Sequence, residues 1–472
     1  MVDAPAFRPS PPCLDSLIEP PTDGTPVVPL IPVRADGLDD WLAAQDPGRA
    51  AWVRATGFSA KIGQTCPLPG PDGTLAGMLA GLGDGRDRWA LAGLPRALSP
   101  GVFALDGAGD GDAVALAWAL GAYRFDRYKG EPAEPPARLV WPEGCDRARV
   151  RRRVAGMALV RDLVTTPAAD LGPSELAGVA RALAEHHGAR FSEIVGDALL
   201  TEDWPAVHAV GRGSARAPRL LDLRWGDAAQ PRVTLVGKGV VFDSGGLDLK
   251  PSSAMLLMKK DMGGAAHALG LAHMIMDAGL PVCLRLLIPA VENMVSGDSF
   301  RPLDVIRTRK GLTVEVGDTD AEGRLVLADA LAEADRETPA LLLDMATLTG
   351  SARAALGPDV PAVFTRDDAL AADLMDAATA VDEPVWRLPL HAPYRSMLDS
   401  TVADIHSTGT NRFGGAITAA LFLAEFVSPE TPWLHVDMFA WTQKSRPGRP
   451  EGGEAQALAA LFGLVERRFG AA

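Results

Sequence analysis

Three acidic residues and an arginine lie close together in the segment Asp318-Thr-Asp-Ala-Glu-Gly-Arg-Leu325. A strand-like apolar run at residues 312–316 precedes the segment, and an apolar helical stretch at residues 325–334 follows it. Like charges this close repel one another unless cations lie between them. Two divalent ions about 3.5–4 Å apart, bridged by a shared carboxylate, would remove the repulsion. The segment therefore indicates a two-metal site, although a helix cap would also explain Asp318 or Asp320 taken alone.

Three earlier segments place further charged side chains near small residues. Lys238 and Asp243 lie among glycines that let a backbone approach a ligand closely, just after an apolar run. Lys250 follows in a loop, and Asp261 precedes a helix of small residues. Each has an ordinary alternative, such as a helix cap for Asp261 or a surface lysine for Lys238. Together with the acidic segment, they favour one shared charged site.

The elements that must position these residues alternate between strand and helix from about residue 171. Short apolar runs at 233–236, 282–289 and 341–345 are typical of buried strands, and helical stretches at 265–278 and 325–334 separate them. This alternation predicts an α/β domain with a central, mostly parallel sheet covered by helices. Ligand sites in such sheets gather at the carboxyl ends of the strands, where the charged segments fall.

The chain before residue 140 is rich in proline and glycine and shows no catalytic spacing. It offers only short apolar runs, such as those at 75–82 and 102–105, followed by a helical stretch at 112–129. The glycines at 81–85 faintly resemble a phosphate-binding turn, but they lack its later glycine and helix start, so we favour a strand-to-loop turn. A helix at 145–164 follows, with arginines on its polar faces.

Length and composition bound the remaining possibilities. A chain of 472 residues is too long for a single hydrophobic core, so we expect two domains. We place one domain at 1–140, a linker helix at 141–170 and a catalytic domain at 171–472. A net charge of −14 opposes nucleic-acid binding, whose sole support is the arginine cluster at 147–153. No long apolar run or secretory signal stands out, so we expect no membrane association. Four widely spaced cysteines predict free buried thiols and a cytoplasmic protein.

At these segments the sequence resembles the leucyl aminopeptidase family of dinuclear metallopeptidases, over roughly residues 155–440. Residues 318–325 match the family motif Asn-Thr-Asp-Ala-Glu-Gly-Arg-Leu at seven of eight positions. Further blocks occur in family order: Gly237-Lys-Gly, Phe242-Asp-Ser-Gly-Gly, Asp261-Met-Gly-Gly-Ala-Ala, Ala346-Thr-Leu-Thr-Gly350 and Gly414-Gly-Ala-Ile-Thr418. The resemblance implies an aminopeptidase that removes the first residue of peptides with a free N-terminus.

The resemblance also implies the metal ligands. Lys238, Asp243, Asp261 and Glu322 would bind the tighter ion, and Asp243, Asp320 and Glu322 the more exchangeable one. Carboxylates dominate this set, which suits manganese as well as zinc. An ammonium offers no lone pair, so Lys238 can bind an ion only if nearby dications keep it neutral.

Lys250 and Arg324 would form the catalytic pair. By resemblance, a water activated by the two ions attacks the carbonyl, Lys250 stabilises the oxyanion, and Arg324 holds a bicarbonate that shuttles the proton. No histidine lies in the four charged segments, and we interpret the nearby His267 as structural. The substrate would contact four residues that match family positions: Met258, Thr347, Leu348 through its carbonyl, and Gly350.

Two departures from the family leave metal preference and substrate preference open. Asp318 stands where the family usually has asparagine, which adds negative charge beside the ions. Residues 434–441 replace a smaller segment, so that Phe439 and Trp441 narrow or reshape the pocket for the first residue. Family members form homohexamers, and some bacterial members also bind DNA. The resemblance also implies that residues 1–140 form a small α/β domain that takes no part in the chemistry and serves assembly. A nucleic-acid-binding regulator and an inactive metal-binding scaffold are the two other hypotheses, and the scaffold is disfavoured because all seven metal and catalytic residues are present.

Overall fold

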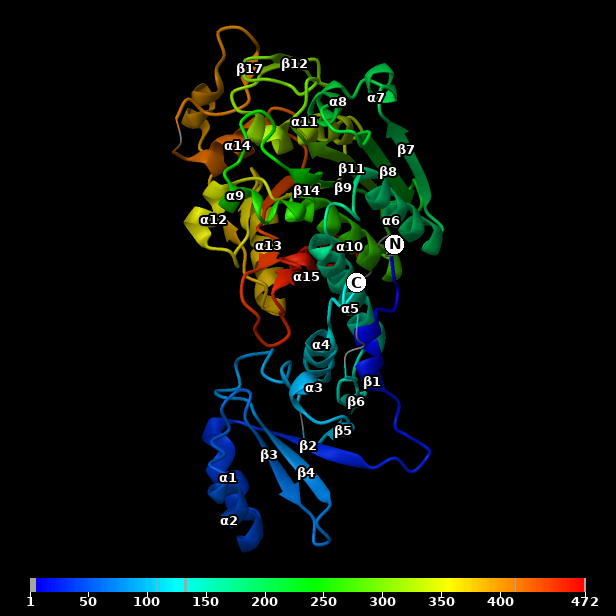
Figure 1. Cartoon of the computed structure of the whole chain (residues 1–472), viewed down its shortest axis with the longest axis vertical. Coiled ribbons are helices and arrows are strands. Elements are labelled where there is room, and N and C mark those ends of the chain that lie inside the picture. The colour runs from blue at the N-terminus through cyan, green and yellow to red at the C-terminus, as the bar shows by residue number, and fades with distance from the viewer. Residues whose placement is uncertain (1–5, 108, 131–133, 412, 471–472) are drawn as a thin grey trace. The chain divides into compact units, whose positions relative to one another are not determined.

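The computed structural model describes residues 6–107, 109–130, 134–411 and 413–470, which form two compact units (Figure 1). The smaller unit comprises Arg8–Ala158 with Gln443–Glu451. The larger unit consists mainly of Leu159–Thr442 and Gly452–Ala472. Each unit has its own sheet and helices, so the predicted two-domain α/β organisation is confirmed.

The smaller unit is built on a six-stranded sheet. All neighbouring strands run parallel except the antiparallel edge pair β3 and β4. In spatial order the strands are β1 (Leu17–Ile18), β6 (Arg138–Val140), β5 (Val102–Leu105), β2 (Val27–Val33), β4 (Leu75–Gly81) and β3 (Thr65–Pro69). Its helices are α1 (Leu38–Ala43), α2 (Pro47–Ala55), α3 (Leu94–Ala97) and α4 (Gly111–Ala122), with 3-10 turns at Pro12–Ser16 and Ala35–Gly37.

Two predictions for this unit differ in outcome. The chain does turn from strand β4 into a loop at 81–85, and Gly83 and Gly85 take positive φ angles there, so the strand-to-loop interpretation is confirmed. The predicted helix at 112–129 is too long, because α4 ends at Ala122 and Tyr123 is extended. Past that point, aromatic rings at 125 and 128 pack on each other instead, with centroids 5.9 Å apart, and aromatic side chains favour a helix only weakly.

The larger unit contains a nine-stranded sheet in which parallel pairs predominate, as predicted. The path through the sheet is β16 (Trp386–Arg387), β15 (Ala362–Phe364), β18 (Trp433–Asp437), β14 (Leu341–Ala346), β9 (Arg232–Gly237), β11 (Cys283–Asn293), β8 (Arg219–Trp225) and β7 (Arg190–Val195), with β10 (Gly239–Asp243) beside β11. The predicted strands at 233–236, 282–289 and 341–345 are β9, β11 and β14. Their side chains are buried almost throughout, which explains their continuous apolar sequences.

Helices cover this sheet on both sides (Figure 1). On one side α10 (Gly263–Asp277) packs on β9 and β14, with α6 (Pro173–His186) and α15 (Leu458–Phe469) beside it and α13 (Asp368–Val381) against α15. On the other, α11 (Glu322–Asp335) packs on β9, β11 and β14, flanked by α8 (Pro205–Gly211) and α14 (Gly415–Ala424). The apolar side chains of α11, α14 and the central strands form the largest part of the core on this side.

The long helix α5 and several shorter elements complete the larger unit. They are α5 (Arg147–Thr165, which begins in the smaller unit), α7 (Ala198–Thr201), α9 (Ser252–Met255), α12 (Gly350–Leu356), β12 (Val305–Arg307), β13 (Thr313–Glu315), β17 (Ile405–His406), β19 (Trp441–Thr442) and β20 (Gly452–Gly453). Three 3-10 turns, η3 (Met258–Lys260), η4 (Thr319–Ala321) and η5 (Ala392–Leu398), join them. Among the described residues, no helix combines the length and apolar character needed to cross a membrane.

Glycine at the start of α10 brings this helix close to the sheet. A Cβ atom on Gly264 would lie 2.0 Å from the main-chain oxygen of Met345 in β14, so no larger residue fits. The helix is buried on all sides except at Asp277, which explains why its sequence is apolar all round. The small residues thus fix the distance between α10 and the strand ends that carry the charged segments.

The four cysteines are unpaired, as predicted. Cys13 and Cys66 are buried, whereas Cys145 and Cys283 are partly exposed, so the prediction of buried thiols is wrong for these two. Cys145 lies before α5, and Cys283 opens β11, where strand ends reach the solvent.

Candidate active site

The carboxyl ends of three adjacent parallel strands carry the candidate site. Lys238 follows β9, Thr347 follows β14, and Asp437 ends β18. The strands are in register, with Met345 opposite Gly237 and Ala346 opposite Asp437. Segments that lie far apart in the sequence therefore meet at one edge of the sheet, the usual ligand site of such sheets.

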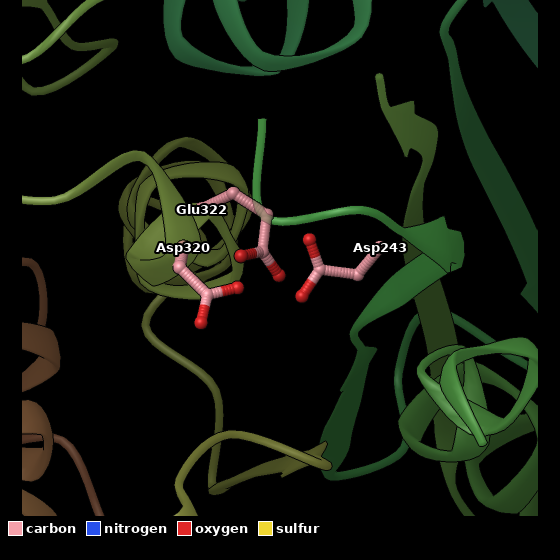
Figure 2. A group of neighbouring side chains, drawn as sticks. All are labelled: Asp243, Asp320 and Glu322. Atoms are coloured by element: carbon pink, nitrogen blue, oxygen red, sulfur yellow. The ribbon is translucent and has the colours of Figure 1, made fainter. Parts of the chain in front are cut away.

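Three carboxylates point toward one another above this edge, as Figure 2 shows. Asp243 ends β10, Asp320 lies in η4, and Glu322 is the first residue of α11. One oxygen from each lies within 4.8 Å of one oxygen from the others. The structure thus gathers three of the five residues predicted to bind metal into a single cluster.

The electrostatics of this cluster call for a cation. Burial, followed by the negative charge of Asp243, raises the pKa of Glu322 and also that of Asp320. Both carboxylate oxygens of Glu322 are buried; Oε1 pairs with Lys238, whereas Oε2 accepts no hydrogen bond from a described group. Buried carboxylates of this kind are unfavourable unless a proton or a cation compensates them. Divalent ions bound by oxygen ligands therefore fit the residues present.

Without bound ions, Lys238 supplies a positive charge that partly compensates the acids of the cluster. Its Nζ lies 2.7 Å from Asp261 Oδ2 and 2.9 Å from Glu322 Oε1, and it donates to the Thr347 carbonyl at 3.3 Å. Burial would lower the pKa of Lys238, but the charges of these carboxylates outweigh burial and raise it. A Cβ on Gly323 would lie 2.4 Å from Lys238 Cε, so this glycine makes room for the lysine. To bind an ion, Lys238 must first lose its proton.

Asp261, the fifth predicted ligand, faces Lys238 from the end of η3. It accepts hydrogen bonds from Lys238 Nζ at 2.7 Å and from Thr347 Oγ1 at 2.8 Å. Burial alone would raise the pKa of Asp261, but Lys238 and then Lys260 hold it below its usual range. Asp261 is therefore ionised and available to an ion on the Lys238 side of the cluster.

Lys250 occupies the opposite side of the three acids. Its Nζ lies 2.8 Å from Asp243 Oδ2 and also pairs with Asp320. Burial would lower the pKa of Lys250, but these two carboxylates raise it, so the side chain is a cation. A positive charge thus stands beside the cluster, on a side chain that reaches it from a separate loop.

Asp318, the departure from the family motif, serves the backbone. Its carboxylate accepts a hydrogen bond from the main-chain N–H of Asp320 at 2.8 Å and caps η4. An asparagine oxygen can accept the same bond, so the turn tolerates either residue. Burial, with the charge of Asp248 nearby, raises the pKa of Asp318. The capping interpretation thus applies to Asp318, and the helix that follows begins at Glu322 rather than near Arg324.

Arg324 lies one turn along α11, with 8% of its surface exposed. Its Nη1 donates to the Ser407 carbonyl at 2.7 Å, while its Nε is buried and donates to no described group. Burial lowers the pKa of Arg324 to about 10, which leaves it charged at neutral pH. A charged side chain with an unused buried donor suits an anion such as bicarbonate.

A cavity of about 300 Å³ opens beside the charged cluster. All four residues predicted to contact the substrate line it, namely Met258, Thr347, Leu348 and Gly350. Phe439 also lines it, as expected, whereas Trp441 does not.

The sequence interpretation missed three charged residues that line the same cavity. They are Lys260, Arg353 and Asp437. Two consecutive lysines before Asp261 were a signal for Lys260, and Asp437 lies in the segment 434–441 expected to reshape the pocket. Nothing in the sequence placed Arg353 near the site.

His267 takes no part in this site. Its buried ring donates from Nδ1 to the Gly263 carbonyl at 2.6 Å and accepts at Nε2 from the Gln456 main chain at 2.9 Å. Both nitrogens are thus used within the fold. Burial lowers the pKa of His267 to about 4.

The low pKa of His267 predicts a loss of stability in acid. In the unfolded chain the ring takes up a proton near pH 6.5. The stability that the neutral, buried ring contributes to the fold is therefore complete above pH 6.5 and decreases as the pH falls toward 4. The full effect is at most about 3 kcal/mol. Lowering the pH from 7 to 4.5 should therefore reduce the stability of the wild type more than that of a His267→Gln variant. Thermal unfolding at the two pH values measures this difference. A His391→Gln variant at an exposed position should follow the wild type; parallel curves for all three proteins would refute the assignment.

Comparisons with known proteins identify the family of both domains. The model of the cytosol aminopeptidase family, catalytic domain, matches residues 158–462, and that of the M17 aminopeptidase N-terminal domain matches residues 28–142. A probable cytosol aminopeptidase from Syntrophotalea carbinolica is 42% identical over 365 residues, 74% of this chain and 73% of the relative. A peptidase B from Pectobacterium carotovorum is 42% identical over 348 residues, 72% of this chain and 79% of the relative.

Two solved structures share the fold. The cytosol aminopeptidase from Coxiella burnetii has a TM-score of 0.93 and 49% identity, covering 96% of this chain and 100% of that one. A bottromycin maturation enzyme in complex with Mn has a TM-score of 0.84 and 36% identity, covering 93% of this chain and 99% of that one.

Proposed function

The chain belongs to the cytosol aminopeptidase family, and from this premise we propose that it removes the N-terminal residue of peptides in a reaction that needs two divalent ions. The observation that carries the proposal is the convergence of Asp243, Asp320 and Glu322, with ligand oxygens within 4.8 Å, beside a cavity. Lys238 and Asp261 complete the set from the ends of neighbouring elements.

We propose zinc or manganese as the ions. Lys238, Asp243, Asp261 and Glu322 would hold the tighter one, and Asp243, Asp320 and Glu322 the more exchangeable one. When bound, the ions supply a water-derived nucleophile near neutral pH and polarise the scissile carbonyl. A structural relative in complex with Mn supports a divalent ion in this fold, and the raised pKa values of Asp320 and Glu322, caused by burial and by the charge of Asp243, support it in this chain.

Two cations of the chain would act on the reacting groups. Lys250 lies against Asp243 and Asp320, so its ammonium is positioned to stabilise negative charge that develops on a carbonyl oxygen beside the cluster. Arg324 would hold a bicarbonate through its unused Nε donor, and this anion would carry the proton to the leaving amine. No other general base is needed among these residues.

The cavity would select peptides by their first residue. Its wall at Met258, Thr347 and Gly350 would receive the first side chain, and the Leu348 carbonyl would hold the substrate backbone. A volume of about 300 Å³ leaves room for the first side chain beside the charged cluster. The free N-terminal amine would be recognised at the Lys238 side of the site.

The remaining proposals concern the whole protein. We propose a cytoplasmic homohexamer that acts on peptides and associates with neither membranes nor nucleic acid, with residues 1–140 apart from the chemistry, 141–170 as a linker and 171–472 as the catalytic domain. The arginines that favour the nucleic-acid hypothesis are partly used inside the fold. Arg147 and Arg151 stack over the Trp141 ring at 5.5 and 5.3 Å, which reduces their availability to phosphates.

A panel of aminoacyl-amides tests the proposed function. We expect hydrolysis with added Mn or Zn, none after chelation, and recovery when the ion is restored. N-acetylated copies of the same amides provide the control and should stay intact, because they lack the free amine. A chain that cleaves no member of the panel, or cleaves the acetylated copies equally well, is not this aminopeptidase.

A further inference from the structure

Lys260 forms part of the cavity wall although it is a lysine with only 5% of its surface exposed. It ends η3, immediately before Asp261. Its Nζ lies 3.4 Å from Asp261 Oδ1, a long ion pair, and 5.5 Å from the centre of the Phe439 ring. The ammonium is therefore largely removed from water and faces a space large enough for a ligand.

A second cation approaches the same ring. The guanidinium carbon of Arg353, from α12, lies 4.6 Å from the centre of Phe439, and Arg353 also lines the cavity. Lys260, Arg353 and Phe439 thus form one wall, which we call the cationic wall. Two like charges around a single ring repel each other, and an anion placed between or beside them relieves that repulsion.

The acids of the cavity are already engaged elsewhere. Asp243 and Asp320 pair with Lys250, and Asp261 accepts its shorter bonds from Lys238 and Thr347. Asp437 accepts from the main-chain N–H groups of residues 348 and 349 at 2.9 and 3.1 Å, and from the Thr349 hydroxyl at 2.6 Å. Of these four acids, Asp261 contacts the cationic wall, through its 3.4 Å pair with Lys260. The charge that this long pair leaves on the wall is available to a ligand.

We infer that the cationic wall selects peptides whose first residue carries a carboxylate side chain, glutamate or aspartate. An apolar first side chain would remove the remaining water from the buried Lys260 without offering it an acceptor, which is unfavourable; Arg353 is exposed and keeps water. A carboxylate makes charge-assisted hydrogen bonds with the same groups. This inference rests on the proposed function, because it assigns the first substrate residue to this cavity.

Glutamyl and glutaminyl amides provide the matched test, since their first side chains have the same shape and differ in charge. We expect the wild type to show kcat/KM at least about tenfold higher for the glutamyl substrate, the scale of a charge-assisted hydrogen bond. Lys260→Met and Arg353→Met should each move the ratio toward one. Lys259→Met is the control, because Lys259 donates to the Thr165 carbonyl at 2.6 Å, contacts the Trp441 ring and lies outside the cavity. This variant should keep the wild-type ratio.

The outcomes separate the two proposals. A wild-type glutamyl-to-glutaminyl ratio of kcat/KM at or below one overturns the proposed role of the cationic wall, as does a ratio that stays unchanged in both methionine variants. In either case, turnover of the glutaminyl or leucyl amide still supports the aminopeptidase. Loss of turnover on every amide overturns the aminopeptidase instead. Calorimetric binding of free glutamate against glutamine to the metal-loaded protein then decides the inference without turnover. Tighter binding of glutamate that weakens in Lys260→Met supports the wall, and equal binding of the two overturns it.

Discussion

A Glu322→Gln variant should lose bound metal and, with it, activity by about 10³-fold or more, since divalent ions supply several kcal/mol to this kind of reaction. Glutamine keeps the shape of the side chain but removes the charge. A carboxylate oxygen of Glu322 lies within 4.8 Å of oxygens of Asp243 and Asp320, and Glu322 also pairs with Lys238. Glu322 therefore contacts residues proposed to bind each of the two ions. Metal content after dialysis and kcat/KM on a good amide substrate provide the measurement.

The same substitution at Glu333 is the control for this variant. Glu333 lies on the same helix but pairs with Arg285 and Arg309, away from the cluster. Glu333→Gln should therefore retain the wild-type metal content, whatever it costs in stability. If Glu322→Gln also retained two ions per chain and full activity, Glu322 would not be a ligand, and the dinuclear proposal would need another bridge.

Much of the fold was predictable because buried parallel strands impose a plain signal. The strands β9, β11 and β14 are covered on both sides, so their sequences are continuous apolar runs separated by helices. The acidic segment at 318–325 was equally visible, since acids so close together at a strand-to-helix junction have few structural reasons to exist. Both signals are local, and the rule that ligands gather at the carboxyl ends of parallel strands connected them.

Residues whose role depends on distant neighbours were not predictable in this way. Arg353 enters the site through its position over Phe439, and Asp437 through the bonds it accepts from residues 348 and 349. In sequence, each is an ordinary charged residue on a helix or at a strand end. The end of α4 at Ala122 was also missed, because aromatic residues after it favour a helix only weakly and give no sharp stop signal in sequence.

The roles of Lys238 and Lys250 could be inferred from the family resemblance but not from their contacts in the structure. The resemblance to the family implied one lysine as a ligand and one as an electrophile, yet in the chain alone both are charged and paired with the same group of acids. Lys238 is paired with Asp261 and Glu322, and Lys250 with Asp243 and Asp320. Their roles therefore separate only when ions compete for those carboxylates, so a test must measure metal content and turnover independently.

A Lys250→Met variant makes that separation. Methionine keeps much of the length of the side chain and removes the charge. We expect kcat to fall by about 10²- to 10³-fold, the range for losing one group that stabilises an oxyanion, with little change in KM. Metal affinity should be unchanged or higher, because Asp243 and Asp320 lose the ammonium that neutralises them. Metal content and steady-state kinetics on the same preparation measure both effects.

We thus expect different combinations of metal content and turnover in the two variants. Glu322→Gln should lose ions and turnover together, whereas Lys250→Met should keep the ions and lose turnover. A Lys250→Met enzyme with kcat within a few-fold of the wild type would show that the oxyanion is stabilised by other groups. Loss of ions from the same variant would show instead that Lys250 organises Asp243 and Asp320 for binding. Because Lys250 pairs with both carboxylates while its side chain remains partly open to the cavity, its charge is placed for the electrophilic role.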